Sequence, residues 1–377
     1  AENAHRIPVV EAGKRFRFNV LAVSETAPGQ FPQVRFSVTD PTSNDAPWDI
    51  HAAAPFTVCA GGASRLFVDI GWSTSDYANV GTGFNPGLPV QINVLNACGG
   101  NSVKNADGSF TATSPVPVPA GQTGSLVAAL EGHPAVDVDP GTPGAERIAV
   151  RNAVRYAPIT DPTARPRRAV VEIERCDECH GQLSLHGSNR TDSIETCVAC
   201  HAPGATDVNR RVPGSACDTA LGLDDATIDM KVMIHAIHSG QYSACGFGNT
   251  PHDYSGVVYV GKLNNCEGCH KPDTYYPVDA TAVIGPTTDA NNPALYTDDV
   301  ATSPNTAACG ACHTSPAARA HMTGNGGDYA AGKDASGRLV SAGLETCTLC
   351  HGPGRNQDVK LMHNIDGFEK YNVRDND

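Results

Sequence analysis

The sequence predicts an all-β N-terminal domain, an antiparallel sandwich or barrel, followed by a domain of mostly irregular and α-helical structure. Two observations support this prediction. In the first half of the chain, apolar and polar residues alternate in short segments between clusters of Gly, Pro and Asn. After residue 170, such segments give way to a repeated cysteine motif. We place the β domain at residues 1–165 and the second domain at residues 166–377.

The expected strands of the first domain follow a period of two, which is typical of strands with one buried face. The alternating apolar residues are Phe16, Phe18 and Val20; Val34, Phe36 and Val38; Leu66, Val68 and Ile70; and Val90, Ile92 and Val94. Residues 157–168 contain three prolines and are expected to form a linker. Residues 169–173 are mostly apolar and predict a short strand leading into the first cysteine motif.

Composition argues against two classes of protein. A formal charge of −13 over 377 residues makes binding to nucleic acid phosphates unfavourable. No apolar run reaches the roughly 18 residues of a membrane helix. The first residues, Ala1–Ala4, lead directly into polar sequence, as expected for a processed mature end or for a fragment.

Ten of the 14 cysteines fall into five pairs of one spacing, and a histidine follows each pair directly. The five motifs are Cys176-Asp-Glu-Cys179-His180, Cys197-Val-Ala-Cys200-His201, Cys266-Glu-Gly-Cys269-His270, Cys309-Gly-Ala-Cys312-His313 and Cys347-Thr-Leu-Cys350-His351. This spacing is the attachment signature of c-type haem. Cysteines three residues apart share one face of a helical turn, where each thiol can add to a porphyrin vinyl group. The sequence therefore predicts five covalent haems c.

Paired cysteines also occur in two other kinds of site. Structural zinc sites use such pairs, but they do not require a histidine after each second cysteine. A thioredoxin-like redox motif occurs once in a chain, not five times. Calcium is a second candidate cofactor, for which the sequence offers no supporting motif.

The number of histidines matches six-coordinate iron at every haem. Of the 14 histidines, five follow the cysteine pairs as proximal ligands and five others are well placed as distal ligands. The proximal set is His180, His201, His270, His313 and His351. The distal set is His186, His235, His238, His321 and His363. With both axial positions filled, the irons would carry electrons without binding a substrate.

Residues 230–240 predict a helix that ends at Gly240 and carries His235 and His238 on one face. A single helix approaches a haem from one side only, so these two histidines should ligate two different haems. His186 follows His180 by six residues, a tether too short to wrap around the same porphyrin, so we assign His186 to a neighbouring haem. The irons served by His321 and His363 are left open.

Other side chains were considered as distal ligands. Met233, Met322 and Met362 lie within two residues of a distal histidine, but packing against porphyrin edges is the simpler interpretation. His252 would be a sixth candidate for five positions. The remaining histidines, His5, His51 and His133, are expected to be surface or packing residues of the β domain.

Haem c is attached outside the cytoplasm, so the chain should be exported to an oxidising compartment. The four cysteines outside the motifs are Cys59, Cys98, Cys217 and Cys245. We expect disulfides joining Cys59 to Cys98 and Cys217 to Cys245. Buried free thiols are the alternative.

Several further segments carry a family resemblance. They are Gly71–Tyr77, Leu130–Asp137, Arg167–His180, His186-Gly187, Met233–Gly240 and Pro251–Ser255. Together they make the chain resemble the extracellular decahaem cytochromes of metal-reducing bacteria, the MtrC/OmcA family. The likeness covers one β domain with its pentahaem domain, most like the C-terminal half of those proteins.

The resemblance implies a β domain built as a Greek-key sandwich or split barrel and a staggered pentahaem domain with bis-histidine ligation. It also implies an extracellular or outer-surface location rather than the periplasm. The implied partners are other multihaem cytochromes or an outer-membrane electron conduit, with minerals or flavins as acceptors and self-association possible. The chain departs from the family in having five motifs rather than ten, no lipid-anchor cysteine at Ala1 and no closely spaced cysteine pair in the β domain.

These residues are compatible with three hypotheses about the function of the chain. An electron carrier, able to reduce external acceptors by outer-sphere transfer, fits saturated irons and is the leading hypothesis. A subunit of an extracellular cytochrome filament is the second. A multihaem reductase of nitrite or a sulfur compound is the third, although the Cys-x-x-Cys-Lys motif of pentahaem nitrite reductases does not occur.

Overall fold

The computed structural model describes residues 7–79, 87–139, 144–278, 283–288, 299–332 and 344–365. The chain divides into two compact units. The first consists of Ala1–Arg168 and Cys176–Ala202, and the second consists of Ala169–Arg175 and Pro203–Asp377. The first two cysteine motifs therefore pack with the strand-rich part of the chain, and the domain boundary at residues 165/166 stays a prediction.

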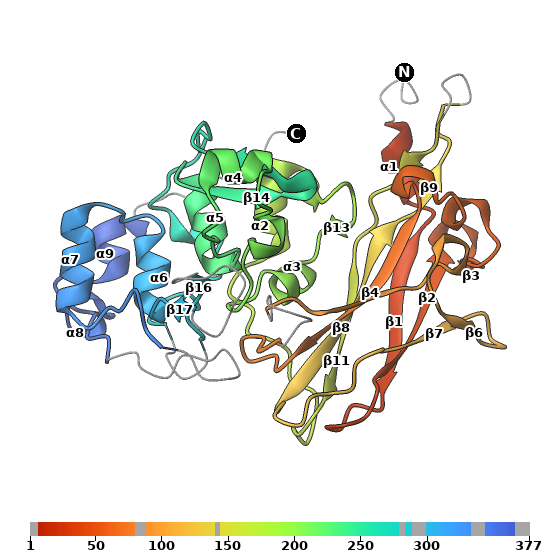
Figure 1. Ribbon diagram of the computed structural model, residues 1–377, viewed down its shortest axis with the longest axis horizontal. Helices are drawn as coiled ribbons and strands as arrows, with labels where there is room; N and C mark the ends of the chain where they lie inside the picture. The colour runs from red at the N-terminus through yellow and green to blue at the C-terminus, as the bar shows by residue number, and fades with distance from the viewer. Residues whose placement is uncertain are drawn as a thin grey trace, which may run out of the picture. The chain divides into compact units, whose positions relative to one another are not determined.

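The first sheet of the strand-rich unit has the order β1-β2-β7-β6, with β3 paired to β2 (Figure 1). The bounds are β1 (Arg17–Ser24), β2 (Gln33–Asp40), β3 (Ala46–Pro47), β6 (Val103–Lys104) and β7 (Phe110–Thr113). All pairs are antiparallel, and Phe36 of β2 lies opposite both Val20 and Phe110. The helix α1 (Pro8–Gly13) precedes this sheet.

The second sheet has the order β11-β8-β4-β5 and is also antiparallel. Its strands are β4 (Arg65–Trp72), β5 (Val90–Asn93), β8 (Ser125–His133) and β11 (Ala153–Pro158), and a short ladder pairs β9 (Ala135–Val136) with β10 (Glu146–Arg147). Every residue of the central strand β8 is buried, so both of its faces are covered.

The apolar residues of the two sheets form one large core. The alternating residues expected from the sequence are all in it, from Phe16 just before β1 to Val94 after β5. Phe36, Phe110, Trp72 and Leu130 are completely buried, as period-two strands require. The prediction of an all-β N-terminal domain is confirmed, with one correction: residues 169–173 form no strand, because only Val171 makes an isolated bridge and a helix begins at Ile173.

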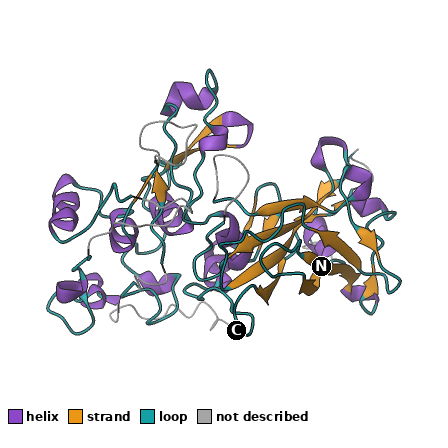
Figure 2. Cartoon of the chain, turned by 60° about the horizontal axis from the view of Figure 1, so that its bottom comes forward, coloured by secondary structure: helices purple, strands orange, loops and turns teal. Residues whose placement is uncertain are grey.

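The rest of the chain consists mainly of short helices and loops (Figure 2). The α-helices are α2 (Ile173–His180), α3 (Ile194–Cys200), α4 (Ala216–Leu221), α5 (Met230–His238), α6 (Pro304–Gly310), α7 (Pro316–Gly324), α8 (Thr348–His351) and α9 (Val359–His363). Two-stranded ladders join β12 (Ser184–Leu185) to β13 (Arg190–Thr191), β14 (Ser243–Gly246) to β15 (Thr250–Asp253), and β16 (Thr287–Thr288) to β17 (Val300–Ala301). Single 3-10 turns lie at Pro41–Ser43, Ala54–Phe56, Ala60–Gly62, Asn96–Cys98, Val208–Arg210, Phe247–Asn249 and Cys266–Gly268. None of the helices among the described residues is long and apolar enough to cross a membrane.

An apolar cluster of the second unit lies around α5. The cluster around α5 contains Ala236, Tyr242 and Ala244, with Met233 and Ile237 packed against it. Helices as short as those of this unit are marginal by themselves, so packing against other groups must hold them in place.

Two disulfide bonds are present, in the pairing expected from the sequence. One joins Cys59 to Cys98 in the strand-rich unit, and the other joins Cys217 to Cys245 in the second unit. The first closes a loop of 39 residues that includes β4 and β5.

We predict that the double variant C59S/C98S lowers the free energy of unfolding by about 2–4 kcal/mol, because the bridge restricts the unfolded chain. Thermal unfolding of wild type and variant, each with and without reductant, measures the effect. Reductant should lower the melting temperature of the wild type toward that of the variant. An unchanged melting temperature in the variant would show that this bridge contributes no stability.

Candidate haem centres

Each cysteine motif is folded as one helical turn. The first lies at the end of α2, the second spans α3 and the residue after it, and the fifth lies in and just before α8. In the last four motifs the histidine N–H donates to the carbonyl of the first cysteine, at 2.8–2.9 Å. This i to i−4 bond brings both thiols and the histidine onto one turn. All ten motif cysteines are free thiols, four of them exposed and six half-buried.

Four motif histidines each face a second histidine, and the centres of the two rings are about 6 Å apart. The ring centres are 6.0 Å apart for His186 and His201, and 5.9 Å apart for His235 and His270. The separation is 6.1 Å for both of the other pairs, which are His313 with His363 and His321 with His351. Each pair combines one predicted proximal residue with one predicted distal residue.

This spacing can be compared with the requirement of an iron bound between two imidazoles. Metal–imidazole nitrogen bonds are about 2.0–2.1 Å long, and the ring centre lies roughly 1 Å behind the nitrogen. Two rings on opposite sides of one iron therefore have centres roughly 6 Å apart. The facing pairs fit this requirement, whereas no group of three or more His, Cys, Asp or Glu among the described residues could hold a metal ion by itself.

Backbone carbonyls orient several of the imidazoles. The Nδ1 atom of His363 lies 2.8 Å from the Val359 carbonyl, and that of His351 lies 3.0 Å from the Gln357 carbonyl. His270 and His238 have the same kind of partner, the carbonyls of Val170 and Ile234. A donor bond from Nδ1–H fixes the ring and leaves Nε2 as the ligand atom, as in most metal-binding histidines.

Burial keeps two of the distal candidates neutral. It lowers the pKa of His186 to about 4, with a further contribution from the positive charges of Arg190 and Arg65. Burial likewise lowers the pKa of His235 to about 4. A neutral imidazole is the form that binds a metal, so both residues are ready to ligate at neutral pH.

The pairs connect neighbouring motifs rather than residues of the same motif. His186 follows the first motif but faces His201 of the second, in line with the assignment to a neighbouring haem. His321, in α7, lies eight residues after His313 but faces His351. His363, in α9, lies 12 residues after His351 but faces His313. The fourth and fifth motifs thus exchange their distal candidates, which the tether lengths alone could not decide.

Of the remaining predicted ligands, His238 lies on the helix that the sequence predicted for it. His238 is in the last turn of α5, one turn from His235, and its ring meets the edge of Tyr259 at 5.4 Å. Gly240 has a φ of +67°, which suits the predicted end of this helix. The assignments of His180 as a proximal ligand and His238 as a distal ligand stay predictions.

Histidines and methionines outside the ligand set have other surroundings. The ring of His252 packs directly on Gly246 of the neighbouring strand. His51 lies 2.9 Å from the Ser102 hydroxyl and His133 is buried in β8, whereas His5 is outside the described residues. The Met322 sulfur accepts a hydrogen bond from the Tyr329 hydroxyl at 3.3 Å, which supports a packing role.

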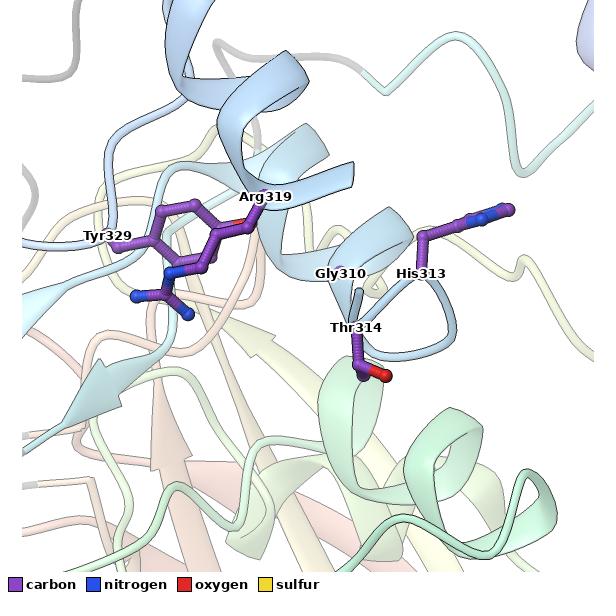
Figure 3. A pocket seen from close by; sticks show the side chains of 5 residues that line it. All are labelled: Gly310, His313, Thr314, Arg319 and Tyr329. Carbon is purple, nitrogen blue, oxygen red and sulfur yellow. The ribbon is translucent and has the colours of Figure 1, made fainter. Parts of the chain in front are cut away.

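A small hollow lies beside the fourth motif and is lined by Gly310, His313, Thr314, Arg319 and Tyr329. Figure 3 shows the Arg319 guanidinium over the Tyr329 ring on one side of Gly310, while the His313 imidazole points to the other side. The guanidinium carbon is 3.7 Å from the ring centre. The imidazole is therefore directed at His363 and not into this hollow.

The fourth and fifth motifs are joined by one carboxylate. Glu345, two residues before Cys347, accepts five hydrogen bonds from the start of α6, the helix that carries Cys309. The donors are the Ser303 hydroxyl and the backbone and side chains of Asn305 and Thr306. Burial alone would raise the pKa of Glu345, but these bonds outweigh burial and hold it below its usual range. The negative charge of the carboxylate also offsets the partial positive charge of the N–H groups at the start of α6.

The model for the family described as outer membrane cytochrome MtrC/MtrF-like, domains II/IV, matches residues 168–364. Among solved structures, the chain is similar to MtrC from Shewanella baltica OS185, with a TM-score of 0.58, 16% identity, and coverage of 93% of this chain and 53% of that one. It is also similar to the outer membrane decaheme cytochrome OmcA, with a TM-score of 0.57, 18% identity, and coverage of 94% and 50%. The chain thus spans about half the length of these proteins, and the likeness is one of fold. No curated protein matches the chain.

We predict that E345Q lowers the free energy of unfolding by about 1–3 kcal/mol, because an amide NH2 cannot accept the bonds that one carboxylate oxygen receives. The folded-state pKa of Glu345 is below the unfolded value near 4.3, so its contribution is present above that pH and is lost as the pH falls through the folded value. The difference in melting temperature between wild type and E345Q should therefore shrink in acid. The exposed Glu146, changed to Gln, serves as the control. A difference that grows in acid would refute this account.

Proposed function

We propose, from the premise that this chain belongs to the family of MtrC/MtrF-like outer membrane cytochromes, that it carries five covalent haems c and transfers electrons between them. Membership rests on the match over residues 168–364. The facing histidine pairs carry the proposal for this chain, because each pair joins an attachment motif to a second imidazole at the spacing that one iron needs.

The proposed axial pairs follow from that spacing. The pairs are His201 with His186, His270 with His235, His313 with His363, and His351 with His321. His180 and His238 are the remaining members of the proximal and distal sets. The cysteines of each motif are the proposed attachment points, and the division into a β domain (1–165) and a haem domain (166–377) is part of the same proposal.

Haem c, when bound, supplies an iron that changes between the ferric and ferrous states by one electron. With two imidazoles at each iron, no coordination position is open to a substrate. The residues around the motifs then serve to hold the rings, exclude water and keep neighbouring centres close. This arrangement favours conduction over chemistry at iron, and it disfavours a reductase of nitrite or sulfur compounds, which needs a vacant position.

We further propose a location at the outer cell surface, with transfer to external acceptors such as minerals or flavins. The similar structures are named as MtrC and as an outer membrane decaheme cytochrome, which supports this class of role. An outer-membrane conduit or another multihaem cytochrome would supply the electrons. Assembly into a filament is the alternative, and electron microscopy of the purified protein distinguishes the two.

We predict that the mature protein exceeds its polypeptide mass by five haems, all of them low-spin. Five attachment motifs are matched in number by five distal candidates, so no iron should lack a sixth ligand. Intact mass spectrometry counts the haems, and electron paramagnetic resonance of the oxidised protein reports the spin states. A high-spin ferric signal equal to one full haem would contradict saturation and favour a reductase.

A second prediction tests the exchanged pairs. Replacing His321 or His363 with Ala should each convert one haem to high spin, because each histidine is the sixth ligand of one iron. The double variant H313A/H363A should affect only one haem, whereas H351A/H363A should affect two. Spin counts by paramagnetic resonance, with haem content checked by mass, separate these outcomes. The opposite counts would show that His363 pairs with His351 instead.

The same approach tests the helix α5. H235A and H238A should each produce one high-spin haem, and the combined variant should produce two, because the ligands are assigned to different irons. H252A is the control and should leave all haems low-spin. A combined variant with only one high-spin haem would mean that both residues act on the same iron.

A further inference from the structure

The outer face of the second sheet is covered by the segment that carries the second motif. Leu126, Ala128 and Leu130 of β8 belong to the core between the sheets, so by alternation Glu131 points to the opposite face. There α3 packs on β8, β4 and β11, and β13 packs on β8. Glu131 is thereby completely buried beneath the second motif, within one compact unit.

Four charged side chains meet at this position. The carboxylates are Glu131 and Asp69, which are 0% and 1% exposed, and the cations are Arg190 and Arg65. An Arg190 nitrogen lies 3.1 Å from a Glu131 oxygen and 3.9 Å from an Asp69 oxygen. The Arg65 guanidinium lies 3.9 Å from Glu131 and is one-third exposed, so the cluster has a route to solvent.

The Glu131 carboxylate has few hydrogen-bond donors among the described residues around it. Neither of its oxygens accepts a hydrogen bond of normal geometry from the described residues. Asp69, in contrast, accepts one from Gln91 at 3.1 Å. Two buried carboxylates that share one close cation are hard to ionise together, and the site can hold a proton at modest cost. Burial and the negative charge of Asp69 accordingly raise the pKa of Glu131, and burial also raises that of Asp69.

The cluster touches the second haem attachment point. The Cys200 sulfur is 3.8 Å from an Asp69 oxygen. Attachment of a haem replaces the S–H of Cys200 by a thioether, so Asp69 would then lose this weak donor. Arg190 and Arg65 also contribute to the low pKa of His186, the proposed distal ligand of the same iron, so the charges and the haem site act on each other.

The elements packed around Glu131 carry other titratable side chains. His133, on the same face of β8, has its pKa lowered to about 4 by burial and by the charge of Arg147, so it stays neutral. Cys197 and Cys200 of α3 are consumed by haem attachment. On β11, burial raises the pKa of Tyr156 to about 12. Glu131 and Asp69 are the carboxylates of this cluster whose pKa burial raises, so they are the groups considered for proton exchange.

We propose, building on the function above, that Glu131 with Asp69, Arg190 and Arg65 forms a proton-binding site coupled to the haem at Cys197 and Cys200. When one electron enters that centre from a neighbouring haem or an external reductant, its charge falls by one. One proton from solvent then binds the Glu131 carboxylate, and it returns to solvent when the electron leaves. A charge change in a buried site of low dielectric acts strongly on a carboxylate nearby.

Proton uptake on electrochemical reduction tests this coupling. Wild type, E131Q and E146Q are reduced in weakly buffered solution between pH 6 and pH 9, and a pH indicator measures the protons taken up. We expect the wild type to take up more protons than E131Q, by at most one per chain. E146Q removes an equal but exposed charge from the same unit and should match the wild type. Equal uptake by wild type and E131Q overturns the proposal.

A second measurement assigns the effect to one centre. In an H186A background the second haem should be high-spin, so its own absorption band allows its potential to be followed. That potential should fall as pH rises in H186A and should fall less steeply in H186A/E131Q. The same slope in both proteins overturns the proposal.

Two controls keep the outcome clear. Where E131Q does not fold, D69N replaces it: removing the like charge beside Glu131 should move the proton uptake to lower pH, and an unmoved uptake refutes the coupling. A wild type that lacks five low-spin haems would contradict the proposed function itself. A five-haem, low-spin protein with unaltered uptake in E131Q would contradict only the coupling.

Discussion

The second half of the chain depends on one constraint: two imidazole rings must be held about 6 Å apart, from opposite sides, at each proposed haem. A short tether cannot carry a ligand around the edge of the porphyrin to which it is attached. In each of the four facing pairs, the histidine outside the motif follows a different motif along the chain, as His186 does toward His201. The exchange between His321 and His363 requires α7 and α9 to reach each other's motifs. The proposed ligand pairs would therefore tie together short helices such as α7 and α9 that lie far apart in the sequence.

The same constraint explains why single polar contacts matter here. The five hydrogen bonds of Glu345 hold the start of α6 beside the fifth motif, and both motifs must keep this register for His313 to face His363 and for His351 to face His321. In the strand-rich unit a sheet provides the support instead. There β8 is buried on both faces because the second motif packs on the outer one. The second motif is therefore supported by a sheet, whereas the fourth and fifth motifs are supported by hydrogen bonds between turns.

Features with a local signal could be predicted from sequence. The strands around Phe36 and Val68 follow from period-two alternation, and the turn in each motif follows from its spacing. Features that depend on distant partners could not. The eight- and 12-residue tethers of His321 and His363 allow either iron, and the Glu345 cap joins residues about 40 positions apart. The expected strand at residues 169–173 failed because the run is too short to outweigh the helix of the motif that follows it. Glu131 gives no sequence signal, since its burial comes from the segment folded over β8.

If all the proposed centres have the same two imidazole ligands, differences in their potentials must come from burial, hydrogen bonds and nearby charge. The second motif has four charged side chains beneath it, and the fourth has the Arg319–Tyr329 stack at its side. A fixed cation favours the reduced state, whereas a buried carboxylate opposes it until a proton neutralises the charge. If the proton coupling proposed for Glu131 holds, the potential of the centre above it should depend on pH, because these carboxylates are buried where solvent screens them weakly.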